Sequence, residues 1–264
     1  MLDEVLALAR RAGDAILAVV AARAHAPTLK ADDSPVTAAD LAADRVIAAG
    51  LAALDPLTPL VSEEQERVHD GTLARFWLVD PLDGTREFVR GGDDYTVNIA
   101  LVEDGVPVLG VVHVPATGVS YAAARGAGAT RVEDGESRPI AARRAGAQDE
   151  LVVVASRSHR NDALEAFLGA LPPHRAISIG SSLKLCLVAE GAADLYPRTG
   201  PTSWWDTAAA HAVALEAGAE VVTLDGAPLR YAGPSILNPW FVCSALPRAV
   251  WAAAADAVAG LQRT

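Results

Sequence analysis

The chain has 264 residues, of which 22 are Lys or Arg and 33 are Asp or Glu, so its formal net charge at pH 7 is −11. Lys and Arg are the side chains that neutralise phosphates, and a chain this acidic is therefore a poor candidate for binding polymeric nucleic acid or an anionic lipid surface. Its hydrophobic share of 51% excludes disorder as the dominant state. A small phosphate that binds together with a metal ion stays compatible with this charge.

The cysteines and the two ends of the chain favour a cytoplasmic protein. Cys186 and Cys243 form no CxxC pair, so we expect neither a disulfide framework nor a structural zinc site. Asp3 and Glu4 precede an apolar run that charged residues interrupt, unlike a signal peptide. Asp256 interrupts the Ala-rich C-terminal run, which is shorter than the about 20 apolar residues that span a bilayer. We expect no transmembrane segment.

The first half of the chain predicts two helices followed by an antiparallel meander. Apolar residues recur at spacings of three and four over 2–17, and a capping-box pattern, Thr37 to Asp40, precedes a helical run over 41–54. From residue 76 the runs are rich in β-branched residues, and the pair Asp104-Gly105 predicts a hairpin. The expected strands are 76–80, 96–103, 106–115, 119–124 and, as an extension, 131–140.

In the second half strands and helices alternate, which is typical of sheets covered by helices. The expected strands are 151–155, 176–179, 194–196, 219–224 and 241–244. The expected helices are 161–171, 182–190, 207–217 and 247–261. No long linker separates the halves, so we expect two domains with an extensive interface, 1–145 and 146–264.

Acidic residues gather where predicted strands end. Asp80 and Asp83 follow the strand over 76–79, and two carboxylates with a backbone carbonyl between them suit hard divalent cations, which require oxygen ligands. Glu63, in Ser-Glu-Glu after a short apolar run, supplies another carboxylate. An ordinary Asp-Pro/Asp-Gly turn and a solvated loop charge would explain the same residues without a site.

Asp206 and Asp40 have local explanations too. Asp206 directly precedes the helix over 207–217, where it would serve as the N-cap, and Asp40 is the last residue of the capping box. Each acidic residue is ambiguous alone, and only their combination indicates a metal site.

Four segments, in order, resemble the signatures of the lithium-sensitive, magnesium-dependent phosphatase superfamily that includes inositol monophosphatase and fructose-1,6-bisphosphatase. They are SPVTAAD over 34–40, SEE over 62–64, WLVDPLDGTREF over 77–88 and WDTAA over 205–209. The resemblance implies an α+β or α/β layered sandwich, αβαβα, with the metal ligands mostly in the first half. Further segments resemble the superfamily's branch of bacterial 3'(2'),5'-bisphosphate nucleotidases: 156–159, 179–184, 187–191, 195–198, 200–202 and 237–239.

The resemblance implies two Mg²⁺ ions, with a third, weaker one joining with substrate. The implied metal ligands are Glu63, Asp80, the Leu82 carbonyl, Asp83 and Asp206, with Asp80 bridging the two ions. The implied catalytic residues are Asp40, Glu63 and Thr85, which orient a water for in-line attack on phosphorus. The backbone N–H groups of Gly84 and Thr85 would hold phosphate oxygens, although Thr85 could also simply cap a helix.

A substrate with two phosphates also needs a basic pocket away from the metals. Lys184 and Arg198 are the candidates for the retained phosphate or the adenosine, with hydrogen bonds from Ser181 and His159. The expected substrate contacts are therefore Glu63, Leu82, Asp83, Gly84, Thr85, His159, Ser181, Lys184, Arg198 and Asp206.

The resemblance implies an enzyme that removes the 3'-phosphate of 3'-phosphoadenosine 5'-phosphate, giving AMP, in sulfur assimilation. One alternative is an inositol or sugar phosphatase with the same metal chemistry, and another is a catalytically silent regulator that senses a nucleotide or a metal. The expected partner is a small nucleoside bisphosphate and the expected assembly a monomer or homodimer. The expected location is the cytoplasm or, peripherally, the inner face of the cell membrane.

Overall fold

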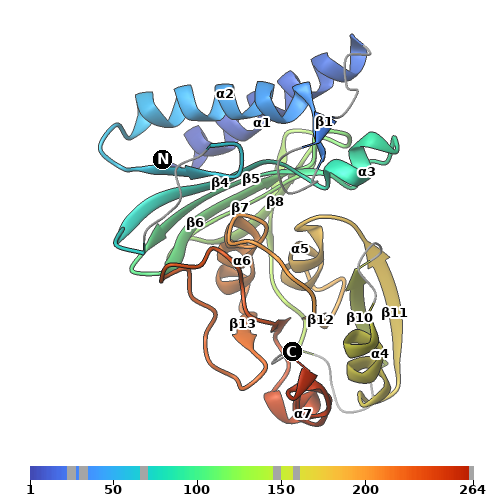
Figure 1. Cartoon of the computed structure of the whole chain (residues 1–264). Helices are drawn as coiled ribbons and strands as arrows, with labels where there is room; N and C mark the ends of the chain where they lie inside the picture. Colours follow the sequence, from blue (N-terminus) through green and yellow to red (C-terminus); the bar gives the residue numbers. More distant parts are fainter. Residues whose placement is uncertain (23–27, 30–34, 66–70, 145–149, 157–160, 262–264) are drawn as a thin grey trace.

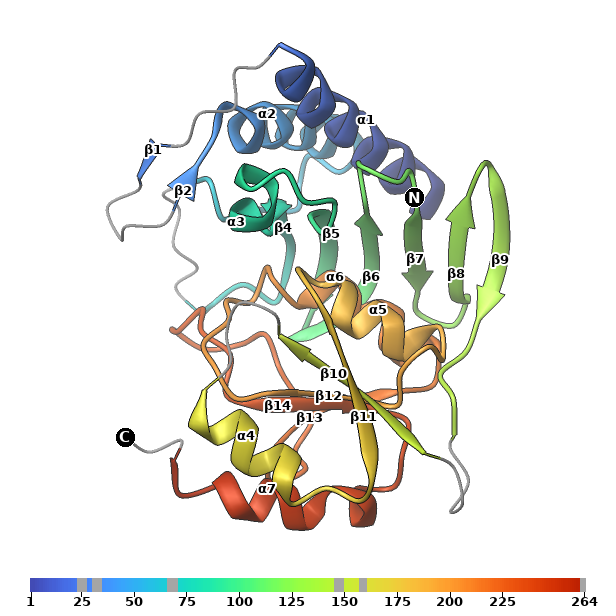
Figure 2. The same ribbon diagram turned by 90° about the vertical axis from the view of Figure 1, so that its right-hand side faces the viewer.

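The structure, a computed structural model, stacks helices and sheets in alternating layers (Figures 1 and 2). It describes residues 1–22, 28–29, 35–65, 71–144, 150–156 and 161–261. From α1 and α2 at the top of Figure 1, the layers run through a first sheet, then α5 and α6, then a second sheet, to α4 and α7 at the bottom. This is the αβαβα sandwich that the family resemblance implies.

The first sheet contains seven strands that follow one another along the chain. They are β3 (Leu60–Ser62), β4 (Arg75–Asp83), β5 (Thr96–Glu103), β6 (Val106–His113), β7 (Ser120–Ala124), β8 (Gly128–Glu133) and β9 (Glu136–Ile140). All neighbours are antiparallel except β3 and β4, which run parallel. The antiparallel meander is confirmed. A short pair, β1 (Thr28–Leu29) with β2 (Pro35–Val36), lies outside this sheet.

Two Asp-Gly pairs close hairpins in this sheet. Asp104 and Gly105 have φ of 49° and 73°, the left-handed conformation that a tight hairpin turn requires, so the predicted hairpin is confirmed. The predicted extension of the meander over 131–140 is confirmed, and it consists of two strands. Asp134 and Gly135, with φ of 52° and 80°, reverse the chain there and divide the segment between β8 and β9.

Helices α1 (Leu2–Ala21) and α2 (Ala38–Leu54) cover the outer face of the first sheet. Their buried apolar side chains form one core with the sheet, including Val5, Leu8, Ile16, Ile47, Trp77 and Ile99. The capping box at the start of α2 is confirmed, because the Thr37 side chain accepts from the Ala39 N–H and Asp40 accepts from the Thr37 N–H at 2.8 Å.

The second sheet is five-stranded and mixed, in the order β11-β10-β12-β14-β13. Its strands are β10 (Leu151–Ser156), β11 (His174–Ile179), β12 (Leu195–Arg198), β13 (Glu220–Thr223) and β14 (Phe241–Ser244). Its outer face packs against α4 (Asp162–Gly169) and α7 (Ala252–Val258). The helix predicted over 247–261 is shorter: a 3₁₀ turn η1 (Arg248–Val250) comes first, and Trp251, at φ −122°, interrupts the helical path.

Helices α5 (Leu183–Ala189) and α6 (Ala208–Glu216) lie between the two sheets and share one core with both. Close packing explains the Ala-rich sequence of α6, since a Cβ atom built on Gly110 of β6 would lie only 2.1 Å from the Ala209 carbonyl oxygen. The boundary predicted between 145 and 146 falls within 145–149, outside the described residues. No helix in the described part of the chain is long and apolar enough to cross a membrane.

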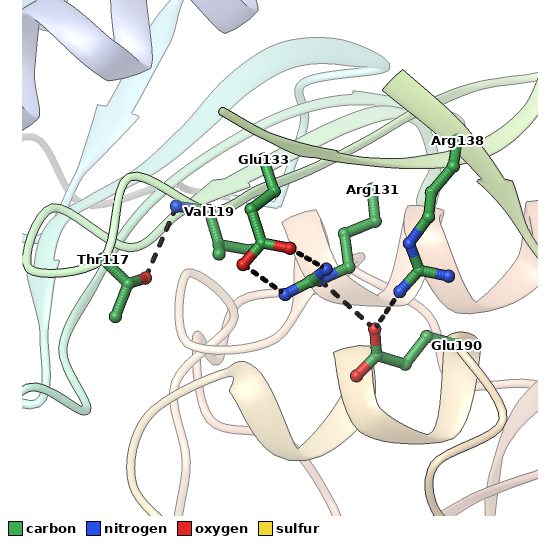
Figure 3. A network of polar contacts seen from close by, with 6 residues as sticks. All are labelled: Thr117, Val119, Arg131, Glu133, Arg138 and Glu190. Atoms are coloured by element: carbon green, nitrogen blue, oxygen red, sulfur yellow. Dashed lines mark hydrogen bonds and ion pairs between the residues drawn. The ribbon is translucent and has the colours of Figure 1, made fainter. Parts of the chain in front are cut away.

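Charged side chains attach the end of α5 to the β8–β9 hairpin (Figure 3). Arg131 Nε and Arg138 Nη2 each lie 3.5 Å from Glu190 Oε2, and Arg131 also pairs with Glu133 at 2.5 Å. The C-terminal end of α5 is thereby fixed against the first sheet, while its N-terminal end faces the site described next.

Candidate active site

A β-bulge at the end of β4 presents the central carboxylates. Asp80 pairs with Asn98 of β5, and Asp83 pairs with Thr96, so three steps along β4 correspond to two along β5. Asp80 is 1% exposed, and its Oδ1 accepts from the Leu82 N–H at 3.1 Å. Asp80, Leu82 and Asp83 all line one cavity of about 230 Å³, an arrangement that an ordinary turn does not by itself require.

The chain leaves this bulge through Gly84, whose φ of 92° is accessible to glycine and strained for other residues. A Cβ there would lie 2.9 Å from the Asp94 carbonyl oxygen. Gly84 is the N-cap of the short helix α3 (Thr85–Val89), so Thr85 is its first residue and makes no side-chain cap. The Thr85 side chain lies instead within hydrogen-bond distance of the Leu82 carbonyl (3.1 Å) and Asp40 Oδ1 (3.3 Å).

Glu63 reaches the same cavity from the end of β3. Its backbone N–H donates to the Val79 carbonyl at 3.1 Å, which continues the parallel pairing of β3 with β4. The preceding Ser62 donates its hydroxyl to Asp44 of α2 at 2.6 Å. The backbone of Glu63 is therefore held beside β4, and its partly exposed side chain lines the cavity.

The second half of the chain completes the cavity. The Ser182 N–H, just before α5, donates to Asp83 Oδ2 at 2.6 Å, and the Ser182 hydroxyl lies 2.9 Å from Asn98 Oδ1. Asp206 lines the cavity and its Oδ2 accepts from the Ser203 N–H at 2.9 Å. The N-cap of α6 is Thr207, so the N-cap interpretation of Asp206 is wrong.

Burial and mutual repulsion raise the pKa values of these carboxylates. Burial, then the charges of Glu63 and Asp83, raises the pKa of Asp80 well above its usual range. Burial also raises the pKa of Asp83 to about 6. For Asp206, burial followed by the charge of Asp83 raises the pKa to about 8. A bound cation would favour the ionised forms of Asp80 and Asp206, because it would offset the burial and repulsion that raise their pKa values.

The donor set fits a hard divalent cation, because every candidate ligand is an oxygen. As placed, no three acidic, histidine or cysteine side chains of the described residues are grouped closely enough to hold a metal ion. Because Mg²⁺ usually keeps several waters and takes only one or two carboxylates, a site here would combine carboxylate, backbone carbonyl and water oxygens.

Two buried cations also line the cavity. Lys184 is 7% exposed, donates to the Ser181 carbonyl and lies 5.7 Å from the centre of the Tyr196 ring. Arg198 is 6% exposed and donates to the carbonyls of Gly200 (3.2 Å) and Pro201 (2.6 Å). Within the described residues, neither cation has a carboxylate within 4.0 Å. Burial, opposed by the charge of Asp83, lowers the pKa of Lys184 to about 8.

The structure thus brings together nearly all the predicted site residues. Those lining the cavity are Glu63, Asp80, Leu82, Asp83, Gly84, Thr85, Ser181, Lys184, Arg198 and Asp206. Asp40 joins them through Thr85. His159 lies outside the described residues. Sequence reasoning missed the cavity residues Ser182 and Tyr196, and for Ser182 no local pattern signals the contact with Asp83.

A family match accompanies this fold and cavity. The model described as "Inositol monophosphatase family" matches residues 1–259 of the 264. The chain belongs to the inositol monophosphatase family.

The chain is also similar to individual proteins and solved structures. The protein of Escherichia coli O157:H7 named "3'(2'),5'-bisphosphate nucleotidase CysQ" is 52% identical over 248 residues, which cover 91% of this chain and 98% of that protein. The crystal structure of CysQ from Bacteroides thetaiotaomicron is 40% identical, covers 90% of this chain and 94% of its own, and has a TM-score of 0.77. The structure of a Thermotoga maritima IMPase is 26% identical, covers 99% of this chain and 98% of its own, and has a TM-score of 0.82.

Proposed function

We propose that this chain is a 3'(2'),5'-bisphosphate nucleotidase. In its reaction, water cleaves the 3'-phosphate ester of 3'-phosphoadenosine 5'-phosphate, giving AMP and inorganic phosphate. The observation that carries the proposal is that one cavity joins a carboxylate cluster to two buried cations, Lys184 and Arg198. The 52% identity to a CysQ protein supports the same substrate class. We also propose that this reaction serves sulfur assimilation.

The carboxylate side of the cavity would hold Mg²⁺. Its ligands would be Glu63, Asp80, the Leu82 carbonyl, Asp83 and Asp206, in two sites that share Asp80. When bound, the ions supply charge neutralisation to the phosphoryl oxygens and lower the pKa of a bound water.

Thr85 and Asp40 would orient the attacking water. The Thr85 hydroxyl has a single hydrogen and two acceptors within 3.3 Å, so its oxygen keeps lone pairs that accept a hydrogen bond from water. Asp40 is 2% exposed, and its Oδ2 also accepts from the Thr37 N–H at 2.8 Å. The pair is anchored to the backbone at both ends, through Thr85 at the Leu82 carbonyl and through Asp40 at the Thr37 N–H. Glu63 would hold the water from the other side.

Lys184 and Arg198 would bind the phosphate that is retained. Both are buried and bond carbonyl oxygens in place of carboxylates, so their positive charges remain uncompensated within 4.0 Å among the described residues. An anion at this end of the cavity would supply the missing charge. Ser181, at the turn into α5, lies beside Lys184 and adds a hydroxyl.

A panel of phosphate esters tests the proposal. Phosphate release is measured from 3'-phosphoadenosine 5'-phosphate, adenosine 3'-phosphate, an inositol monophosphate and fructose 1,6-bisphosphate, with and without Mg²⁺ and Li⁺. We expect Mg²⁺-dependent turnover that is fastest with the nucleoside bisphosphate. Preference for the inositol or fructose ester would establish the alternative phosphatase, and no turnover of any ester would indicate the silent regulator.

We further propose that the enzyme acts in the cytoplasm on free nucleotides. Cys186 and Cys243 are both buried free thiols, which is consistent with a reducing compartment. Peripheral membrane association and the choice between monomer and homodimer stay predictions.

A further inference from the structure

The segment Leu237-Asn-Pro239, which no proposed role yet includes, lies against the turn that carries Asp206. Ser203 forms an isolated antiparallel bridge with Leu237. The Trp204 N–H donates to the Ile236 carbonyl and the Asn238 N–H donates to the Thr202 carbonyl, each at 2.8 Å. The two segments, more than thirty residues apart in sequence, are thus paired through their backbones.

The Asn238 side chain crosses this turn from one end to the other. It is 8% exposed, and its Nδ2 lies 3.1 Å from Thr202 Oγ1, 2.7 Å from the Ser203 carbonyl and 3.1 Å from Thr207 Oγ1. An amide has two N–H donors, so it can bond two of these three acceptors at a time, while its buried Oδ1 has no hydrogen-bond partner in the described part of the chain. Asn238 therefore holds together the start and the end of residues 202–207.

The turn held in this way connects the two proposed phosphate sites. The Ser203 carbonyl accepts a hydrogen bond from the Asn238 amide. The Ser203 N–H in turn donates to Asp206 Oδ2 at 2.9 Å. On the other side, Arg198 donates to the carbonyls of Gly200 and Pro201, immediately before the turn. Movement of the turn would thus change the spacing between Asp206 and Arg198.

A second buried network fixes the far end of the turn. The Tyr231 hydroxyl donates to Thr207 Oγ1 at 3.1 Å, and His211 Nδ1 lies 2.9 Å from the same hydroxyl. Thr207 in turn donates to the Trp204 carbonyl at 3.2 Å. Because Thr207 is held by the core, loss of the Asn238 amide would release mainly the Thr202–Ser203 end.

We propose that Asn238 is a positioning residue that sets the distance between Asp206, at the cleaved phosphate, and Arg198, at the retained phosphate. The role rests on the proposed function, since only a substrate with two phosphates senses that distance. A misplacement of about 1 Å costs up to about 100-fold in rate. Asn238 thereby determines selectivity for nucleoside bisphosphates over monophosphates.

The test compares Asn238→Asp, which keeps the shape and replaces the donor by an acceptor, with wild type on 3'-phosphoadenosine 5'-phosphate and adenosine 3'-phosphate. We expect the ratio of the two kcat/KM values to fall by at least about tenfold. Ser244→Ala is the control: it removes a buried hydroxyl that donates to the Asp194 carbonyl at 2.7 Å in the second sheet, away from the cavity. Its ratio should stay at the wild-type value.

If both kcat/KM values fall equally in Asn238→Asp, their ratio is unchanged. That result would show that Asn238 only supports the structure, and it would overturn the inference. If that variant does not fold, Asn238→Ser, which keeps a smaller donor, is judged by the same ratio. Wild-type protein that turns over no nucleoside bisphosphate would overturn the proposed function and this inference with it, whereas active wild type with an unchanged variant ratio overturns the inference alone.

Discussion

At the scale of residues, the site depends on short polar contacts between segments that are distant in sequence. Asp80 and Asp83 could be identified from the sequence because they lie beside one turn. The contact between Thr85 and Asp40, 45 residues apart, was available only from the family resemblance. The contact between the Ser182 N–H and Asp83, 99 residues apart, was not predicted. Every residue except proline has a backbone N–H, so the residue type does not show which N–H will donate to a distant side chain.

The Thr85 hydroxyl provides a test at this scale. Thr85→Val keeps the side-chain shape and removes the oxygen that lies 3.3 Å from Asp40 and 3.1 Å from the Leu82 carbonyl. Because the water would lose its orienting group, we expect kcat for phosphate release to fall by about 100-fold. Thr85→Ser restores the hydroxyl and should recover most of the activity. Equal rates in wild type and Thr85→Val would remove Thr85 from the proposed mechanism.

At the scale of elements, local sequence patterns predicted most helices and strands and failed where two signals competed. The extension of the meander over 131–140 was predicted, but the turn at Asp134 and Gly135 that divides it was not, although the same pair of residue types identified the hairpin at Asp104. The bulge between Asp80 and Asp83 depends on the register of β4 with β5, which one strand's sequence does not contain.

The contact between β6 and α6 tests the packing of elements. Gly110→Ala would place a Cβ 2.1 Å from the Ala209 carbonyl oxygen, so the helix would have to move. We expect the free energy of unfolding in urea to fall by about 1–3 kcal/mol. The control Gly169→Ala, at the end of α4, adds a Cβ with no atom within 4 Å and should change stability by less than about 1 kcal/mol. Similar stabilities for both variants would contradict this packing.

At the scale of the whole molecule, the order of the layers brings the two halves of the chain to one site. The alternation of strands and helices predicted covered sheets, and the family resemblance supplied the αβαβα order. Neither showed which helices form the middle layer, where α5 and α6 share a core with both sheets. That arrangement brings Lys184 and Asp206, from the second half, to the bulge of β4.

The stability of the whole molecule should depend on pH through buried histidine. His113 is 6% exposed, and burial, aided by the charge of Arg10, lowers its pKa from 6.5 to about 4. Below pH 6.5 the unfolded chain binds a proton that the folded chain does not bind until about pH 4, so stability falls as the pH falls through this range. His113 should account for about 2 kcal/mol of the loss between pH 7.5 and pH 5.

Urea unfolding of His113→Gln at the two pH values measures this contribution. We expect a pH dependence smaller than that of wild type by about 2 kcal/mol. The control is His174→Gln, on the edge strand β11. The pH dependence of its stability should be closer to that of wild type than the pH dependence of His113→Gln. An unchanged dependence in His113→Gln would show that His113 is not held neutral in the folded protein.

The most direct test of the central claim is phosphate release from 3'-phosphoadenosine 5'-phosphate by wild type and Asp83→Asn, both with saturating Mg²⁺. Asparagine keeps the size of the side chain and an oxygen that can accept from the Ser182 N–H, so we expect an unchanged far-ultraviolet circular dichroism spectrum. The account predicts that kcat/KM falls by at least about 1,000-fold. Turnover close to that of wild type in a folded Asp83→Asn protein would contradict it.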